Sequence, residues 1–532
     1  MLSTAGYWLV GITAAVAFCA VLLYRKGTET FDHWKNRGVP FVPAVPFLGS
    51  APGMVLKTSA RCEELRRLYD RLDGHPCGGL FVATTPVLML RDPELVRKVL
   101  VEHFECFTDR FAARPDEHSP MATNIFQACG SQWRFLRSKM TPAFSPARLR
   151  TMVDTMRGCS EALCEQLGPG ADRGSTVDAK ELSKNFTLDV IGACVYGLQL
   201  NCIGDPDPVL KRMAEDTTSF SWRLAAASFF GAKVPTINFC GLRPEVVSYF
   251  WDLAKTAIRY RKEETRESND FLNILIKLKE RGYIESDENE DSSESRGCNL
   301  DEKEDAPLKV TDDVVAAQCL IFFVAGFETT SATIGFCLYE LALNADVQRR
   351  LRTEVLRVLS RHDGELSYPA LKEMDYLRKV VAETLRKHPP ASTLVRTCTR
   401  ACVLPGTRLQ LQPGDVVLVP IPGLHHDERH FPRPERFDPE RFSAERARLR
   451  HRYCYLPFGE GPRACIGSLL GSVQVKVAVA ALVSRYEVQP CARTAVPLVL
   501  DPRQIARAAA GGVWLKVTRA PPRRPSEENT RH

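Results

Sequence analysis

The sequence contains no Cys-x-x-Cys pair, although it has 18 cysteines among 532 residues. Cys398 and Cys402 stand four residues apart, but no second Cys or His pair with zinc-site spacing accompanies them. A disulfide scaffold would carry a far higher share of cysteine. We therefore expect most of the cysteines to be buried small side chains in a reducing compartment.

The chain also lacks an internal repeat, a β-α-β alternation and a strong excess of one charge. Its net charge is +7, from 71 basic and 64 acidic residues. This surplus is too small and too spread out to indicate nucleic-acid binding, but it suits an anionic membrane surface or an acidic partner. Hydrophobic residues make up 44% and charged residues 25%, which are ordinary globular values. A disordered, collagen-like or multi-span membrane protein is thereby excluded.

Residues 1–26 are expected to form a single membrane anchor. Met1 to Tyr24 contains no charged side chain, and a helix over its apolar part would span about 30 Å, the thickness of the hydrocarbon layer. Arg25 and Lys26 follow this run and no Lys or Arg precedes it, which favours a cytosolic location for the rest of the chain. The alternative is a cleaved signal peptide, which would have a basic start and a shorter apolar run. No later segment is expected to be long and apolar enough to span.

Residues 27–50 are expected to form a proline-rich strap. Pro40, Pro43 and Pro46 recur at every third position, which forbids a helix and favours a stiff extended chain. Such a spacer would fix the orientation of the following domain on the membrane, and the alternative is a plain linker.

The remaining chain predicts one mostly α-helical domain over residues 51–520, with small β-sheets. The longest apolar helix is expected over Asp312–Leu343, with Thr311 as its N-terminal cap. Residues 285–305 are acidic, rich in serine and almost without apolar side chains, so we expect a disordered loop there. Residues 521–532 are expected to be a disordered tail.

The strongest chemical signal is the segment Phe458-Gly-Glu-Gly-Pro-Arg-Ala-Cys-Ile-Gly467. Gly459, Gly461 and Gly467 permit a tight hairpin and a close approach of the backbone to a flat ligand. Cys465 would stand just before a helix, where the helix dipole and backbone N–H groups favour its thiolate. A thiolate held in this way is the ligand that an iron centre requires.

The segment has two alternative interpretations. Gly459 to Ala464 fits the G-x-G-x-x-A pattern of a dinucleotide site, but no β-α-β unit surrounds it. Cys465 could instead be an inert core cysteine, which the neighbouring arginine and glycines make the weaker interpretation.

Together with three further motifs, this loop makes nearly the whole chain resemble the cytochrome P-450 family of haem-thiolate monooxygenases. The other motifs are Ala325-Gly-Phe-Glu-Thr-Thr330, Glu383-Thr-Leu-Arg386 with Pro439-Glu-Arg-Phe442, and Trp133-Arg-Phe-Leu-Arg137. The resemblance implies the cytochrome P-450 fold, bound haem b, and insertion of one atom of O2 into a lipophilic xenobiotic, lipid or hormone. Leu424-His-His-Asp427 and the strap resemble insect microsomal enzymes of the detoxifying type.

The resemblance also implies roles for individual residues. Cys465 is expected to be the axial ligand of the haem iron. The other cofactor residues are expected to be Phe458, Gly459 and Gly467 in the loop, Ala325 and Gly326 in the long helix, and the propionate partners Trp133, Arg137, Arg396 and Arg463. For Arg396 the alternative is a solvated arginine. Glu383, Arg386 and Arg441 are expected to form a buried triad, with Pro434-Glu-Arg-Phe437 as a second possible source of the third member.

In the long helix, Gly326 is unexpected, because a glycine in the middle of a helix lowers the stability of the helix by about 1 kcal/mol. The resemblance implies a groove for dioxygen there, with Glu328 supplying protons and Thr329 holding the oxygen network. A π-type or widened turn would aim these groups inward. The alternative is that Thr329 bonds back to its own helix and that Glu328 is a surface charge.

Electrons are expected to come from a separate NADPH–cytochrome reductase, with cytochrome b5 as a further candidate donor. The acidic face of the reductase would contact basic residues of this chain near the haem motifs, namely Arg134, Lys139, Arg452 and Lys476. The expected location is the endoplasmic reticulum membrane, with the catalytic domain on the cytosolic face and no nucleic-acid partner. By resemblance, the substrate-facing stretches are Arg110–Phe126, Ser219–Phe239, Ile321–Thr329, Leu394–Val395 and Ala510–Val513. Two other functions remain open: a haem-thiolate isomerase or dehydratase, and a non-catalytic haem protein.

Overall fold

A computed structural model describes residues 4–110, 120–205, 207–217, 242–264, 270–281 and 308–521. The predicted loop 285–305, the tail beyond residue 521 and the stretch Ser219–Phe239 lie outside the described residues.

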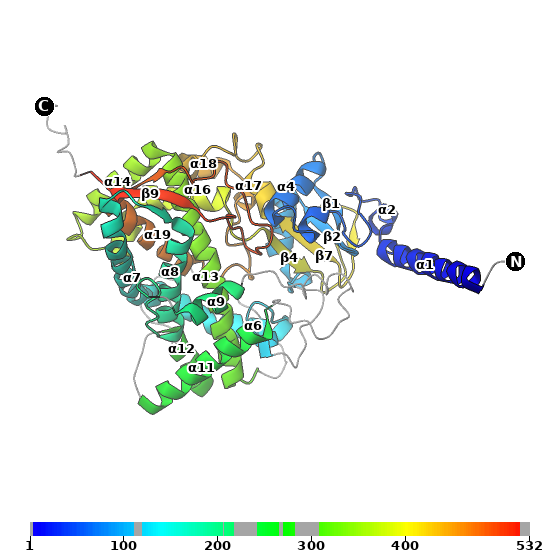
Figure 1. The fold of residues 1–532 in the computed structure, drawn as a ribbon, viewed down its shortest axis with the longest axis horizontal. Helices are drawn as coiled ribbons and strands as arrows, with labels where there is room; N and C mark the ends of the chain where they lie inside the picture. Colours follow the sequence, from blue (N-terminus) through cyan, green and yellow to red (C-terminus); the bar gives the residue numbers. More distant parts are fainter. Residues whose placement is uncertain are drawn as a thin grey trace.

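Helices dominate the described chain, which confirms the mostly-α prediction (Figure 1). The α-helices are α1 (Thr4–Thr28), α2 (His33–Asn36), α3 (Pro52–Val55), α4 (Arg61–Arg71), α5 (Pro93–Arg97), α6 (Gly130–Met140), α7 (Pro146–Asp172), α8 (Ala179–Ile191), α9 (Pro208–Asp216), α11 (Pro244–Glu264), α12 (Phe271–Arg281), α13 (Asp312–Leu343), α14 (Ala345–Leu359), α15 (Tyr368–Glu373), α16 (Asp375–Lys387), α17 (Ile421–His425), α18 (Ala444–Leu449) and α19 (Ser468–Arg485). Short π or 3-10 turns are η1 (Lys98–Glu102), η2 (Phe104–Cys106), η3 (Pro120–Thr123), η4 (Thr141–Phe144), η5 (Gly192–Tyr196), η6 (Pro439–Phe442) and η7 (Arg452–Cys454). Helix α13 has the predicted bounds, and the Thr311 hydroxyl accepts the Val314 N–H at its start.

In the part of the chain that the structure describes, the strands form three small sheets, in the orders β1-β2-β7-β4, β3-β9-β8 and β5-β6. The strands are β1 (Cys77–Val82), β2 (Thr85–Leu90), β3 (Thr176–Asp178), β4 (Thr393–Thr397), β5 (Cys402–Val403), β6 (Gln410–Leu411), β7 (Val416–Pro420), β8 (Tyr486–Pro490) and β9 (Trp514–Arg519). Strand β4 pairs antiparallel with β7, and this register sets Arg396 opposite Val417. The first sheet lies between the helical body and α1 (Figure 1).

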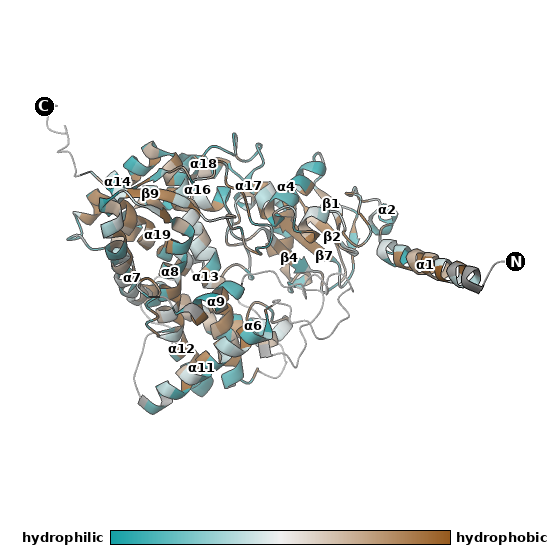
Figure 2. Ribbon diagram, in the orientation of Figure 1, coloured by the Kyte–Doolittle hydropathy of each residue, from teal (hydrophilic) through white to brown (hydrophobic). Residues whose placement is uncertain are grey.

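Helix α1 extends away from the body, and many of its residues are hydrophobic (Figures 1 and 2). The large apolar side chains of residues 7–24 that the structure describes are exposed. Its segment Val10–Thr28 is long and apolar enough to cross a membrane, and 6% of it is buried in the structure. Helices α13 and α19 also have the length and apolarity of a membrane span. The prediction that no segment after α1 would be long and apolar enough to span was therefore wrong. Because 72% and 56% of those spans are buried in the protein, they are core helices.

The proline-rich strap packs on the first sheet. The Trp34 indole N–H donates to the Leu80 carbonyl at 3.0 Å, and Trp34 is buried. The Gly79 N–H donates to the Pro40 carbonyl at 2.8 Å, and the Val42 N–H donates to the Gly79 carbonyl at 3.0 Å. These contacts fix the direction in which the chain leaves α1.

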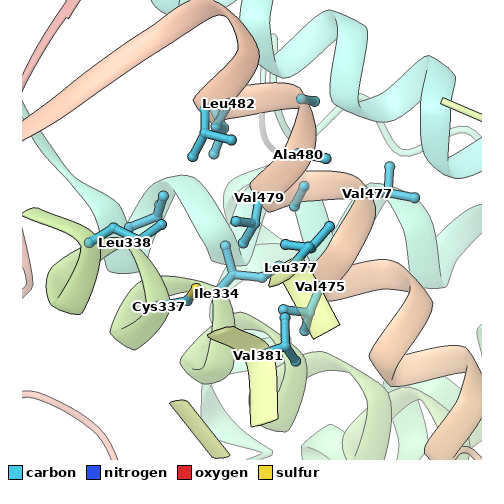
Figure 3. Packing of buried hydrophobic residues seen from close by; sticks show 14 of the residues in the cluster. Ile334, Cys337, Leu338, Leu377, Val381, Val475, Val477, Val479, Ala480 and Leu482 are labelled. Atoms are coloured by element: carbon cyan, nitrogen blue, oxygen red, sulfur yellow. The ribbon is translucent and has the colours of Figure 1, made fainter. Parts of the chain in front are cut away.

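The core that carries the site is built from three long helices. Ile334, Cys337 and Leu338 of α13 pack against Leu377 and Val381 of α16 and against an apolar row on α19 (Figure 3). Where α13 approaches α19, a Cβ on Gly471 would lie 3.8 Å from the Thr330 hydroxyl. This packing brings the first turn of α19, which follows Cys465 in the chain, close to Thr330 of α13.

Candidate functional site

The loop before α19 is a compact double turn. The Gly459 N–H donates to the Leu456 carbonyl at 3.2 Å, and the Cys465 N–H donates to the Phe458 carbonyl at 2.8 Å. Gly459 and Gly461 have φ angles of 71° and 76°, which other residues rarely adopt. A Cβ on Gly461 would also collide with the Leu100 carbonyl of η1. The loop therefore depends on these glycines for its shape and for its contact with η1.

Cys465 is accessible at its surface, yet protein groups surround it on most sides. Burial raises the pKa of its thiol above the ordinary value, against the opposing effects of the Gly467 backbone N–H, Arg110 and Arg137. The Gly467 N–H favours the thiolate, as predicted for this position, and the larger effect of burial was not predicted. A bound metal cation would supply the missing stabilisation, because coordination removes the proton from a thiol.

Arg463 crosses the base of this loop and is fully buried. Its Nε donates to the Thr108 carbonyl at 2.9 Å, and its Nη2 donates to the Ala128 carbonyl at 2.8 Å. The guanidinium lies over the Trp133 ring, 4.0 Å from its centre. Burial and the neighbouring arginines lower the pKa of Arg463 to about 8. Its Nη1 finds no hydrogen-bond partner among the described residues, so one donor still needs an acceptor.

Three more arginines gather around the same loop. Arg137 Nη1 donates to the Ala464 carbonyl at 2.8 Å, which links α6 to the residue before Cys465. Arg396, on β4, is buried and its Nε has no hydrogen-bond partner in the described structure, so it is not the solvated arginine of the alternative interpretation. Arg110 was not predicted as a propionate partner, and its Nη2 donates to the Arg463 carbonyl at 3.0 Å.

This group of arginines fits a flat dianionic ligand. Burial lowers the pKa of Arg110 to about 10 and that of Arg396 to about 9. The carboxylate near them is that of Asp109, 3.5 Å from Arg463 Nη2. Buried cations are stable when acceptors and negative charge compensate them. The two propionates of a haem would supply both to the unpaired donors, and Cys465 would supply the iron ligand.

On α13, Ala325 and Thr329 share a face that is open compared with the buried remainder of the helix. The Thr329 hydroxyl donates to the Ala325 carbonyl at 2.6 Å. The back-bonding of the alternative interpretation is thus present. No π-turn interrupts α13, so the predicted widened turn is absent from this described helix. The Thr329 hydroxyl can still accept a hydrogen bond on its open side.

Glu328 is buried, which excludes the surface-charge interpretation. Burial raises the pKa of its carboxyl, and Lys184 and Lys180 of α8 oppose that effect. Its Oε2 has no hydrogen-bond partner among the described residues. A carboxyl held in this way keeps its proton to higher pH than an exposed glutamate does.

Gly326 was predicted to line a groove at the cofactor. A Cβ at this position would lie 2.6 Å from Cδ1 of Ile191, on α8. The missing side chain therefore points to α8, and the glycine permits close packing of α13 on α8. This packing gives the mid-helix glycine a structural reason, and its role at the cofactor stays a prediction.

Glu383, Arg386 and Arg441 meet as a buried cluster. Arg386 Nε lies 2.7 Å from Glu383 Oε2, and Arg441 Nε lies 3.2 Å from Glu383 Oε1. Two backbone carbonyls, those of His425 and Pro434, accept the remaining Arg386 donors at 3.0 and 2.7 Å. A buried ion pair is tolerable when its remaining donors are bonded in this way.

His425 joins this cluster to the cysteine loop, a role that was not predicted. Its Nε2 accepts the Leu456 N–H at 2.9 Å, so its proton resides on Nδ1, which donates to the Arg386 carbonyl at 3.2 Å. Burial and the nearby Arg386 lower the pKa of His425 to about 3, which keeps the imidazole neutral. The same Leu456 carries the carbonyl that begins the double turn.

Comparison with known proteins identifies the family. The family model described as Cytochrome P450 matches residues 39–514. Cytochrome P450 9e2 of Blattella germanica is 34% identical over 97% of this chain and 98% of its own length. Cytochrome P450 6a2 of Drosophila melanogaster is 33% identical over 96% and 99%, and cytochrome P450 6k1 of Blattella germanica is 32% identical over 97% and 98%. The chain belongs to the cytochrome P450 family, whose members are monooxygenases that bind haem b.

Proposed function

We propose that this enzyme oxidises a lipophilic substrate, a xenobiotic or an endogenous lipid or hormone, on the cytosolic face of the endoplasmic reticulum membrane. When bound, the haem supplies the iron at which dioxygen is reduced and one oxygen atom is transferred to the substrate. The observation that carries the proposal is the position of Cys465 among Arg110, Arg137, Arg396 and Arg463.

Different residues of the chain have different proposed roles around the haem. Cys465 Sγ is the proposed iron ligand, and the unpaired Nε of Arg396 and Nη1 of Arg463 are the proposed propionate donors. Trp133 supports Arg463 by stacking under its guanidinium. Phe458 and Gly459 shape the loop, and Gly467 directs its backbone N–H at the thiol.

Thr329 and Glu328 are the proposed proton-handling pair. The Thr329 hydroxyl donates its proton to the Ala325 carbonyl of its own helix, and its oxygen can accept a hydrogen bond from a donor on the open face. The elevated pKa of Glu328 lets the carboxyl hold a proton at higher pH than an exposed glutamate does. Apolar residues of the family's substrate-facing stretches, such as Ile321 and Leu394, support a lipophilic substrate.

A labelled-oxygen experiment tests the reaction type. The full-length protein in vesicles, with NADPH and a reductase, should place one atom of isotopically labelled O2 in the product of an apolar test panel. A haem-thiolate isomerase would turn over a peroxide substrate without NADPH, and a non-catalytic haem protein would give no product. Thr329→Ala should consume NADPH with less product than the wild type, whereas Thr329→Ser should retain product formation.

The electron donor is proposed to be an NADPH–cytochrome reductase, with cytochrome b5 as a further candidate. Arg134 and Lys139 support this docking, because α6 contacts the cysteine loop through Arg137. Arg452 is exposed but pairs with Glu460 at 2.9 Å. Burial lowers the pKa of Lys476, so we leave this lysine out of the docking surface.

Charge reversal tests the docking surface. Arg134→Glu with Lys139→Glu should slow reduction by the reductase and leave chemical reduction with dithionite unchanged. The exposed Arg503, reversed to Glu, is the matched control. Equal slowing by the control, or no salt dependence in the wild type, would remove this surface from the proposal.

The membrane assignment rests on α1 and the residues that follow it. Val10–Thr28 has the length and apolarity of a span, and Arg25 and Lys26 stand at its end. The positive-inside rule puts such a flank on the cytosolic side. Protease treatment of intact microsomes should therefore digest the catalytic domain, and protection of that domain would reverse the proposed orientation.

A further inference from the structure

A cavity lies between the proline-rich strap and the small sheet β5-β6. Its volume is about 490 Å³, which is within the range of sites that hold small molecules. Residues 37–40 of the strap line one side of it, and residues 407–410 with Gln412 line the other. Cys77, at the start of β1, completes the lining. The cavity shares no residue with the proposed haem site.

An ion pair joins the two sides of this cavity. Arg37 Nη1 lies 2.7 Å from Asp415 Oδ2, and the same carboxylate oxygen accepts the Gln412 N–H at 2.9 Å. Arg37 directly follows α2, and its backbone N–H donates to the carbonyl of the buried Trp34 at 3.2 Å. The first cation of the cavity is therefore held in place by both its side chain and its backbone.

Arg408 supplies a second cation. It is exposed, and in the part of the chain that the structure describes it has no hydrogen bond or ion pair. The turn that carries it is closed by Thr407, whose hydroxyl donates to the Leu404 carbonyl at 2.8 Å and accepts the Leu409 N–H at 3.1 Å. Two guanidinium groups thus line a cavity that has one carboxylate beside it. The excess positive charge suits an anion, and a guanidinium matches phosphate with two parallel hydrogen bonds.

The cavity lies at the end of the body that meets α1 (Figure 1). A Cβ on Gly27, in the last turn of α1, would lie 2.8 Å from the ring of Phe47 in the strap. The Thr30 hydroxyl donates to the Thr84 carbonyl at 2.5 Å. Thr84 stands in the turn that follows β1, and Cys77 begins that strand. Because a six-residue strand extends over about 17 Å, the cavity is about one strand length from the end of the membrane helix.

We infer that this cavity binds the phosphate group of an anionic phospholipid from the membrane that holds α1. Arg37 and Arg408 bind the phosphate oxygens, and the side-chain amides of Gln410 and Gln412 donate to the rest of the headgroup. The cytosolic surface of a membrane carries anionic lipids, which basic groups close to a membrane helix attract. The inference rests on the proposed membrane attachment of α1, and it does not depend on the haem chemistry.

The apolar part of the lining favours a lipid over a free phosphate ion. Val39 is buried, and Pro40 and Leu409 are half-buried beside the two arginines. These side chains would contact the glycerol and the first acyl carbons of a phospholipid, for which inorganic phosphate has no counterpart. The two ligands share their charge, so a competition experiment separates them.

Native mass spectrometry of the full-length holoenzyme, released from detergent micelles, tests the site. With phosphatidylserine and phosphatidylcholine of equal acyl chains, we expect one phosphatidylserine to be retained and phosphatidylcholine to be retained much less. Arg408→Gln should lower phosphatidylserine affinity about tenfold, since it removes a charged phosphate contact. Arg448→Gln, which removes the same charge from an exposed position on α18, is the matched control and should bind like the wild type.

A second variant separates a shaped site from general charge attraction. Gln410→Trp keeps the charge and fills the cavity, so it should also lower phosphatidylserine binding. Wild-type binding by Gln410→Trp, an equal loss in Arg448→Gln, or equal retention of the two lipids would overturn the inference. Displacement of phosphatidylserine by an equal concentration of inorganic phosphate would assign the site to a free phosphate and overturn the lipid.

The same spectra keep this inference apart from the proposed function. The mass of each ion shows whether haem is bound, and micelles contain no bilayer whose orientation could affect the result. Haem-loaded wild type that retains no phosphatidylserine counts against the lipid site alone. Wild type that retains the lipid but no haem counts against the proposed function alone.

Discussion

Replacing His425 with phenylalanine should loosen the loop 458–467, which contains Cys465, while leaving no cavity in the core around residue 425. The imidazole is fully buried and stacks on Tyr455, with ring centres 5.3 Å apart, so a phenyl ring keeps the apolar packing. The variant loses the acceptor for the Leu456 N–H and the donor to the Arg386 carbonyl. A buried polar group without a partner costs about 1–3 kcal/mol, so the two together cost about 2–6 kcal/mol.

That cost falls on the connection between the Glu383–Arg386–Arg441 cluster and the loop. A loss of about 3 kcal/mol is more than a hundredfold in the equilibrium for local opening. We expect a smaller fraction of His425→Phe than of wild type to show the thiolate-type Soret band in the reduced carbon monoxide complex. Haem should also transfer faster to an apoprotein acceptor.

The neighbouring His426 is the matched control. It is also buried, but its Nδ1 faces the Pro422 carbonyl of its own helix at 3.0 Å. His426→Phe should therefore retain most of the thiolate band and the haem. Wild-type behaviour of His425→Phe, or an equal loss in both variants, would refute the reasoning.

Three further predictions concern single side chains. Gly461→Ala should yield little haem-loaded protein, because the φ of 76° at this position and the nearby Leu100 carbonyl exclude a Cβ. Gly158 has open space around it, so Gly158→Ala should bind haem normally. The Soret absorbance per amount of protein measures both. Glu328→Gln should raise the melting temperature at neutral pH: burial raises the pKa of Glu328, so its stability contribution is complete below the ordinary pKa of about 4.3 and is lost as pH rises through the elevated value. The difference between Glu328→Gln and wild type should vanish in acid, and a pH-independent difference would contradict the assignment. Glu383→Ala should cost about 3–5 kcal/mol because it leaves Arg386 and Arg441 unpaired, whereas Glu435→Ala, which breaks the exposed pair with Arg66, should cost about 1 kcal/mol or less in denaturant unfolding.

Helix α13 could be predicted to both ends because its signals are local. Thr311 caps it, two aspartates follow in the first turn, and the apolar residues continue to Leu343. Strand β4 was not predicted, because five residues are too few to show a clear alternation of apolar and polar side chains. Its position is set by pairing with β7, which is distant in sequence. Arg396 was predicted from resemblance, while the strand that carries it was not.

The remaining errors arise from burial, which a single sequence does not display. The net rise in the Cys465 pKa follows from desolvation, whereas the motif alone displays the N–H donors that lower it. Arg110 and His425 lie in segments that were noted only for substrate contact and for likeness to insect enzymes. Their contacts with Arg463 and Leu456 join residues hundreds or tens of positions apart. For His425, the signal in the sequence is an imidazole that directly follows the apolar run 416–424.

The carbon monoxide difference spectrum of the reduced protein, wild type beside Cys465→Ser, tests the central claim most directly. The account predicts a Soret band at the thiolate position in the wild type and its loss in the variant. A folded wild-type haem protein without that band, or a variant that keeps it, would show that another residue holds the iron and would contradict the account.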